Sequence, residues 1–236
     1  MIDDQGNMTV VEHLTELRRR LIISVAAVVV AAIIGFVVSG PAIDLLRSPL
    51  PEQWRKLYFT GAAGAFAAHL KIAFYVGVAI AFPVIVYQVW RFVTPGLTRR
   101  ERRLVWPVIL GGTSLFALGV VVGYLILPFA LGFLLSFSEP DLQPLLTIDE
   151  YIGFIGLMLL AFGLVMEFPI VLIGLTRVGV LNYRTVASRR RTIFVGIVAF
   201  STVVTPGGDI FSPLIMSAVM YLLFEISLFF MKRIRP

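Results

Sequence analysis

The chain has 236 residues, of which 58% are hydrophobic and only 14% are charged, a composition far too apolar for an ordinary soluble domain of this length. The charges cluster between long uncharged runs, which is typical of a polytopic helical membrane protein, whereas a membrane β-barrel would show shorter, alternating runs. The absence of cysteine excludes disulfides and thiolate chemistry, and basic cytoplasmic loops explain the net charge of +6 better than nucleic-acid binding does.

Residues 1–20 are expected to form a cytoplasmic N-terminus that contains an amphipathic helix. Thr9 and Glu12 have the spacing of a capping box at a helix start. Apolar side chains then recur on one helical face, at Val10, Leu14, Leu17 and Leu21. We therefore expect this helix to lie against the membrane surface and to continue into the first span.

Six apolar runs predict an all-α, polytopic membrane protein with six transmembrane helices in a single transmembrane domain, residues 1–236. The expected spans cover about residues 21–38, 70–90, 104–137, 151–176, 193–204 and 213–231. The third run would make about 50 Å of helix against a hydrocarbon core of about 30 Å, so it must tilt, bend or project past the bilayer. The last two spans are short, which implies a thinned bilayer or a neighbour that covers them.

The segment between the first two spans, residues 39–69, is expected to cover the outer mouth of the bundle. Apolar residues recur through it, and prolines, Pro49 among them, interrupt it. We expect short helices that lie across the outer end of the spans.

The basic residues predict the orientation in the membrane. With the N-terminus inside and six spans, sixteen of the twenty lysines and arginines fall on the inner side, and the last two outer loops hold none. Both termini are therefore expected to be cytoplasmic.

The loop after the second span presents one acid among several bases. Pro95 and Gly96 end the preceding helix, and Thr98 and Glu101 have capping-box spacing for the next one. Glu101 is the only carboxylate beside four arginines, which are Arg99, Arg100, Arg102 and Arg103.

Glu16 and Glu101 each have two interpretations. Arginines follow Glu16 at three and four residues, and Glu101 suits a helix N-terminus, so each can be a solvated acid on a helix surface. Alternatively, the two form an acidic spot for a guanidinium ligand, because carboxylate–guanidinium pairing can be bidentate and selective. The residue pattern alone leaves both interpretations open.

Two further acids lie within apolar spans. Glu167, with Pro169 just after it, is costly in a membrane, so we favour a contact with a partner helix or a proton-linked switch over a purely packing role. Glu225 stands nearer the inner end of its span, seven residues before Lys232, where a role on the interfacial helix surface is expected.

Catalytic and metal-binding motifs are missing from the sequence. It contains no H-E-x-x-H, G-x-S-x-G or Walker motif, and its two histidines, His13 and His69, fall on opposite sides of the predicted membrane. We therefore expect no enzyme activity, no metal site and no cofactor.

Five short blocks occur along the chain in a recognisable order. They are His13-Leu14-Thr15-Glu16-Leu17-Arg18-Arg19-Arg20, then Phe92-Val93-Thr94-Pro95-Gly96-Leu97 with Glu101-Arg102-Arg103, then Ala161-Phe162-Gly163 with Glu167-Phe168-Pro169, then Thr205-Pro206 with Asp209 and Phe211-Ser212, and finally Met220-Tyr221-Leu222-Leu223-Phe224-Glu225. Together they resemble the TatC family, the core receptor of the twin-arginine translocation (Tat) system. The match covers nearly the whole chain.

The resemblance implies a curved, cup-like bundle of six helices in the bacterial cytoplasmic (inner) membrane. It also implies a signal-peptide receptor in a translocase that exports folded proteins with the proton-motive force and no nucleotide. Glu16 and Glu101 would bind the paired arginines of the signal peptide, with Phe92, Leu17 and Arg18 at the same site.

The resemblance also implies partners, which are TatA- and TatB-type single-span membrane proteins and the signal peptides of folded cargo, in a homo- or hetero-oligomer. Glu167 would face the concave, membrane-embedded surface, together with Pro169. Pro206 and Asp209 belong to the last outer turn. This turn, Thr-Pro-Gly-Gly-Asp, is a residue longer than the commoner Thr-Pro-Pro-Asp, and Pro213 stands where many members have glutamine.

Two other functions compete with the receptor. A proton-coupled secondary transporter of a small solute would use Glu167 as its coupling site, but the sequence shows no repeated half and no matched pair of broken helices. A structural membrane subunit would bind no arginine-pair peptide.

Overall fold

The computed structural model describes residues 10–93, 105–139, 141, 143–177 and 179–233. Apart from an isolated backbone bridge between Tyr58 and Thr147, the regular structure of these residues is helical. The helices are α1 (Val10–Val37), α2 (Ser39–Arg47), the 3₁₀ helix η1 (Glu52–Trp54), α3 (Gly64–Val93), α4 (Val105–Leu135), α5 (Ile148–Val165), α6 (Phe168–Arg177), α7 (Tyr183–Ser188), α8 (Arg190–Val204) and α9 (Phe211–Met231). The all-helical class expected from the sequence is confirmed for the described residues.

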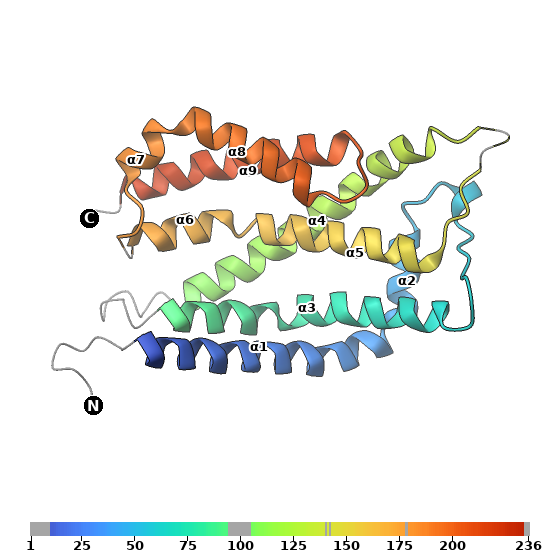
Figure 1. Cartoon of the computed structure of the whole chain (residues 1–236), viewed down its shortest axis with the longest axis horizontal. Helices are drawn as coiled ribbons and strands as arrows, with labels where there is room; N and C mark the ends of the chain where they lie inside the picture. Colours follow the sequence, from blue (N-terminus) through green and yellow to red (C-terminus); the bar gives the residue numbers. More distant parts are fainter. Residues whose placement is uncertain (1–9, 94–104, 140, 142, 178, 234–236) are drawn as a thin grey trace.

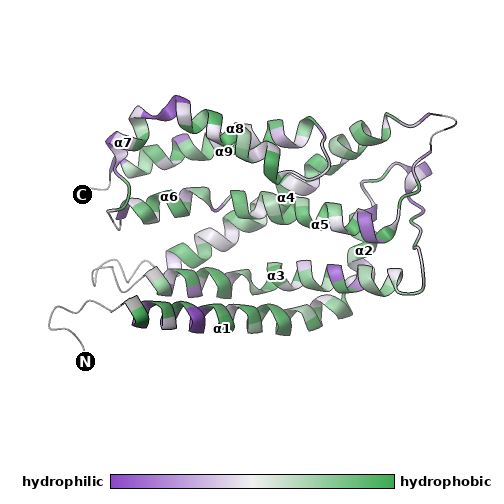
Figure 2. Cartoon of the chain, in the orientation of Figure 1, coloured by the Kyte–Doolittle hydropathy of each residue, from purple (hydrophilic) through white to green (hydrophobic). Residues whose placement is uncertain are grey.

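The long helices alternate in direction. In Figure 1, α1, α4 and α8 run one way, and α3, α5 with α6, and α9 run the other way, so the start of α1 and the end of α9 lie at the same end of the molecule. The helix α4 crosses the others obliquely, which is one of the ways in which a helix of this length can fit a bilayer. The hydropathy colours of Figure 2 show mostly hydrophobic residues along the middle of these helices and more hydrophilic residues towards their ends.

Five helical segments are long and apolar enough to cross a membrane: Val11–Val37, Gly64–Phe92, Val105–Leu135, Ile148–Arg177 and Phe211–Met231. The protein is therefore a multi-pass membrane protein. The helix α8, which contains the expected fifth span, has only 15 residues, or about 22 Å of helix, and it packs along α9.

The helix α1 packs along α3 through small residues. A Cβ atom on Gly35 would lie 2.6 Å from the carbonyl oxygen of Ala73, and one on Gly77 would lie 2.8 Å from the backbone nitrogen of Ala32. Such close backbone approach is how membrane helices associate without a hydrophobic driving force between them. The side of α1 that faces away from α3 is exposed, since only 11% of the most apolar part of this helix is buried.

The segment after α1 lies at the end of the bundle opposite the start of α1 (Figure 1). Carbonyl groups in the last turn of α2, which cannot all be satisfied within the helix, accept hydrogen bonds from tyrosines of the neighbouring helices. The Tyr124 hydroxyl donates to the Leu45 oxygen at 3.0 Å, and the Tyr151 hydroxyl donates to the Leu46 oxygen at 2.7 Å. Pro49 is half-buried and precedes Leu50, which is only 1% exposed. These contacts attach the segment to α4 and α5.

The fourth apolar run forms two helices, not one. Thr147 caps α5, because its Oγ1 accepts a hydrogen bond from the backbone nitrogen of Glu150, three residues later, at 3.4 Å. The helix ends at Val165, and α6 begins at Phe168. Pro169 explains the break, because proline has no amide hydrogen and its ring crowds the carbonyl group four residues before it.

Candidate functional site

One end of the molecule carries most of the described bases, and we call it the basic end. Here α1 begins, α3 and α6 end, α7 lies, and α9 ends (Figure 1). Its described basic residues are Arg18, Arg19, Arg20, Arg91, Arg177, Arg184, Arg189, Arg190, Arg191, Lys232 and Arg233. An acid at this end therefore lies in a strongly positive surrounding.

Glu16 lies in that surrounding and is held by an arginine from its own helix. The Nε of Arg20 donates to Glu16 Oε1 at 2.8 Å, and Arg20 Nη2 donates to the same oxygen. The third arginine nitrogen, Nη1, donates to the side-chain oxygen of Gln88 on α3 at 3.0 Å. The Glu16 side chain remains 21% exposed, whereas the Arg20 side chain is only 10% exposed. One carboxylate is thus linked through one guanidinium to the neighbouring helix.

Phe92 lies at the end of α3, beside the first turns of α1. Its ring stacks on the ring of His13, with centroids 4.3 Å apart and planes 22° apart. Since His13 precedes Glu16 by three residues on α1, the stack places Phe92 near the same helical face as Glu16.

The remaining predicted residues of this site are Leu17, Arg18 and Glu101, and only the first two have described positions. Leu17 and Arg18 are exposed on α1. Glu101 lies outside the described residues, as does the loop that contains it. The structure therefore brings Glu16 and Phe92 to one corner of the basic end and gives no position for the second acid.

Glu167 lies at the junction of α5 and α6. Its Oε1 atom is buried and has no hydrogen-bond partner among the described residues. A Cβ atom on Gly112 of α4 would lie 3.1 Å from the other carboxylate oxygen of Glu167, so a larger residue there would press on the acid. An intramembrane carboxyl without a partner is typical of a functional site, not of packing alone.

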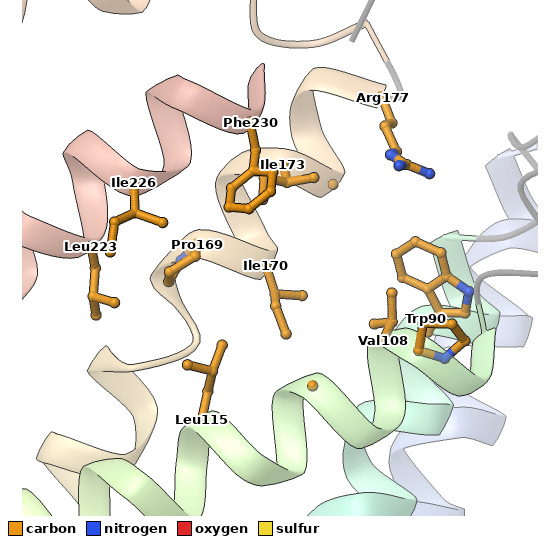
Figure 3. A pocket seen from close by; sticks show the side chains of 13 residues that line it. Trp90, Val108, Leu115, Pro169, Ile170, Ile173, Arg177, Leu223, Ile226 and Phe230 are labelled. Carbon is orange, nitrogen blue, oxygen red and sulfur yellow. The ribbon is translucent and has the colours of Figure 1, made fainter. Parts of the chain in front are cut away.

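Pro169 lines an apolar cavity of about 590 Å³, close to this junction. Figure 3 shows its walls: Leu115 and Val108 from α4, Ile170 and Ile173 from α6, and Leu223, Ile226 and Phe230 from α9. Trp90 and Arg177 lie together at one side of the cavity (Figure 3), and both come from helix turns near the basic end. The cavity thus offers an apolar space with a cation at its basic-end side.

Glu225 connects the last two helices. Arg190 at the start of α8 donates to Glu225 Oε2 at 3.1 Å, and the Tyr221 hydroxyl donates to Glu225 Oε1 at 3.0 Å. The two charged side chains are 50% and 36% exposed, so the ion pair orients α8 more than it stabilises the fold.

The turn between α8 and α9 depends on two glycines and an acid. Gly207 and Gly208 have φ values of 102° and 68°, in the left-handed region that other residues rarely adopt. Asp209 is 4% exposed, and its Oδ1 accepts from the backbone nitrogen of Ser212 at 2.6 Å, which caps the first turn of α9. Pro206 is half-buried at the end of α8. The two glycines therefore let the chain reverse direction between α8 and α9.

No group of three or more histidine, aspartate or glutamate side chains that could hold a metal ion occurs in the described part of the chain. Three residues of the Glu16 corner were not predicted as site residues, namely His13, Arg20 and Gln88. The sequence signal for Gln88 is its amide within the second predicted span, since polar groups in such spans usually pair with another helix.

Comparison with known proteins gives concordant matches. The family model "Sec-independent protein translocase protein (TatC)" matches residues 12–218. A curated TatC protein from Carboxydothermus hydrogenoformans is 35% identical over 97% of this chain and 95% of its own length, and one from Aquifex aeolicus is 36% identical over 94% of both.

Two crystal structures of the twin-arginine translocase receptor TatC resemble this structure. One has a TM-score of 0.77 at 36% identity and covers 93% of this chain and 98% of its own. The other, in DDM, has a TM-score of 0.79 at 35% identity and covers 93% and 99%. Both the sequence and the fold are thus similar to those of these proteins over almost their full length.

Proposed function

The chain belongs to the TatC family of Sec-independent protein translocase proteins, and from that premise we propose that its basic end is the receptor site for twin-arginine signal peptides. As a Tat translocase component it works together with other subunits of that system. We further propose that it forms the core of a translocase that exports folded proteins with the proton-motive force. The alternative of a small-solute transporter finds no support among its relatives.

The proposed topology has six spans, with both termini in the cytoplasm of a bacterium and the protein in its inner membrane. The alternating helix directions and the accumulation of bases at one end support it, because basic segments remain on the cytoplasmic side. The short helix α8 is the sixth crossing segment in this arrangement, and its length of 15 residues requires a locally thinned bilayer or a covering partner.

The observation that carries the receptor function is the position of Glu16. The partly exposed carboxylate of Glu16 offsets the repulsion that the surrounding arginines exert on an arriving cation, and it can accept hydrogen bonds from a guanidinium. Glu101 would supply the second carboxylate from the adjoining loop. Phe92, Leu17 and Arg18 complete the proposed site, with Phe92 offering a ring face beside the peptide.

The membrane-embedded acids are proposed to serve the later steps. Glu167 would present a polar group on the concave surface to an incoming helix, and the apolar cavity beside Pro169 suits the apolar part of a signal peptide. TatA- and TatB-type single-span proteins are the proposed partners, and Glu225 would help to orient the last two helices for them.

The test is photocrosslinking with a signal peptide that carries a photoreactive residue beside its arginine pair. We expect crosslinks to the purified protein from the Arg-Arg peptide and few from a Lys-Lys peptide. Lysine lacks the planar guanidinium that donates two parallel hydrogen bonds to a carboxylate. Glu16→Lys and Glu101→Lys should each abolish the crosslink, and Glu52→Lys, a change at a fully exposed acid on the other end, should not. Equal crosslinking of both peptides, or unchanged crosslinking in both variants, would refute the receptor site.

A further inference from the structure

Arg20 is the most enclosed base of the basic end whose contacts are described. Arg20 is 9% exposed, and Gln88, whose side-chain oxygen accepts from Arg20 Nη1, is 6% exposed. Arg20 therefore differs from Arg18 and Arg19, its neighbours on α1, which are exposed. A guanidinium in such a place needs a counter-charge, and Glu16 provides it.

The geometry of the contact leaves part of Glu16 available. Both Nε and Nη2 of Arg20 bind one carboxylate oxygen, Oε1. No residue in the described ranges bonds the other oxygen, Oε2. A guanidinium that arrives from another chain can thus bind Oε2 while Arg20 keeps Oε1.

Displacement of Arg20 by the ligand would be the other possibility. It would leave an enclosed guanidinium with only the neutral amide of Gln88, and an enclosed charge that loses its partner costs far more than an exposed ion pair gains. Sharing of the carboxylate is therefore favoured over exchange.

We propose that Arg20 is a positioning residue for the signal-peptide site: anchored by Gln88 of α3, it holds Glu16 so that Oε2 accepts a guanidinium of the arginine pair. The inference rests on the proposed receptor function and deepens it. It assigns a specificity role to an interhelical contact between residues 68 positions apart. The carboxylate is thereby fixed in one rotamer before the peptide binds, which lowers the entropy lost on binding.

The test uses two variants that leave the net charge unchanged. Arg20→Lys keeps the charge but cannot donate from both Nε and Nη2 to Oε1. Gln88→Leu removes the acceptor of Arg20 Nη1 on α3 while it retains a buried side chain of similar size. We expect each to weaken binding of an Arg-Arg signal peptide to the purified protein roughly tenfold, the effect of about one charge-assisted hydrogen bond. Arg19→Lys, at the exposed neighbour, is the matched control and should bind as the unaltered protein does.

A coupling measurement separates positioning from a merely structural effect. In a Glu16→Gln background, Arg20→Lys should produce no further loss of peptide affinity, because its effect acts through Glu16. A structural defect would instead lower affinity equally in both backgrounds and would overturn the proposal. Tighter binding by Arg20→Lys alone would also overturn it, because Arg20 would then be a competitor of the peptide.

Failure of the receptor function is distinguishable in the same experiment. If Glu16→Gln itself binds the Arg-Arg peptide as the unaltered protein does, the receptor site is wrong. If Glu16→Gln loses binding while Arg20→Lys and Gln88→Leu retain it in full, only the positioning role is wrong.

Discussion

His13 at the start of α1 stacks on Phe92 at the end of α3, with ring centroids 4.3 Å apart and an angle of 22° between the planes. The two residues are far apart in the sequence, but they fasten two antiparallel helices at the basic end. Because Glu16 lies one helical turn from His13, this stack also sets where the proposed arginine-binding carboxylate stands relative to α3.

The first prediction concerns this stack. Phe92→Leu keeps an apolar side chain but removes the ring, so the stacking energy of about 0.5–1.5 kcal/mol should be lost. The yield of crosslinking to the Arg-Arg peptide should fall several-fold. Phe92→Tyr retains the ring and should crosslink as the unaltered protein does. Equal crosslinking by the leucine variant would show that the ring has no part in peptide binding.

A second prediction separates stability from function at Glu167. Since Oε1 of Glu167 is buried and lacks a hydrogen-bond partner in the described part of the chain, Glu167→Leu should raise stability by about 1–3 kcal/mol. The same change should impair export in cells, because the proposed polar contact with an incoming helix is lost. Thermal unfolding in detergent and export of a Tat-dependent reporter measure the two effects.

The matched control for Glu167 is Glu52→Gln, at a side chain that is 91% exposed. It should change neither stability nor export. A destabilised Glu167→Leu variant would mean that the carboxyl has a stabilising partner, and full export by this variant would remove its functional role.

The third prediction concerns the packing of α4 against α5. A Cβ atom on Gly163 would lie 2.6 Å from Cε2 of Phe116, which is 3% exposed and stacks on Phe82 with a centroid distance of 3.8 Å. The ring cannot move aside, so Gly163→Ala should destabilise the protein by about 1–3 kcal/mol.

Gly132→Ala is the control for this change, since a Cβ atom on Gly132 would meet no described atom within 4 Å apart from the nearby backbone of its own helix. It should leave the thermal unfolding temperature unchanged or slightly higher, because alanine costs less backbone entropy than glycine in a helix. If both alanine variants unfold at the same temperature, α4 and α5 are not packed as closely as this contact indicates.

Local patterns in the sequence determined much of the architecture. The apolar runs predicted the helices because a chain in a bilayer must satisfy its backbone hydrogen bonds within each segment. The spacing of Thr147 and Glu150 suits the start of α5, and Pro169 lies where that run breaks into two helices, since capping and proline effects act within one or two turns. The order of five sequence blocks was enough to identify the family that the comparisons then showed.

Only the tertiary structure decided which polar groups meet. The sequence offered Arg19 and Arg20 equally as partners of Glu16, and the packing of α1 on α3 pairs Arg20 with both Glu16 and Gln88. In the same way, Lys71 of α3 pairs with Asp149 of α5 at 2.8 Å. Such contacts depend on how each helix is rotated about its axis and how closely its neighbour approaches, and periodicity along one helix contains no information on either.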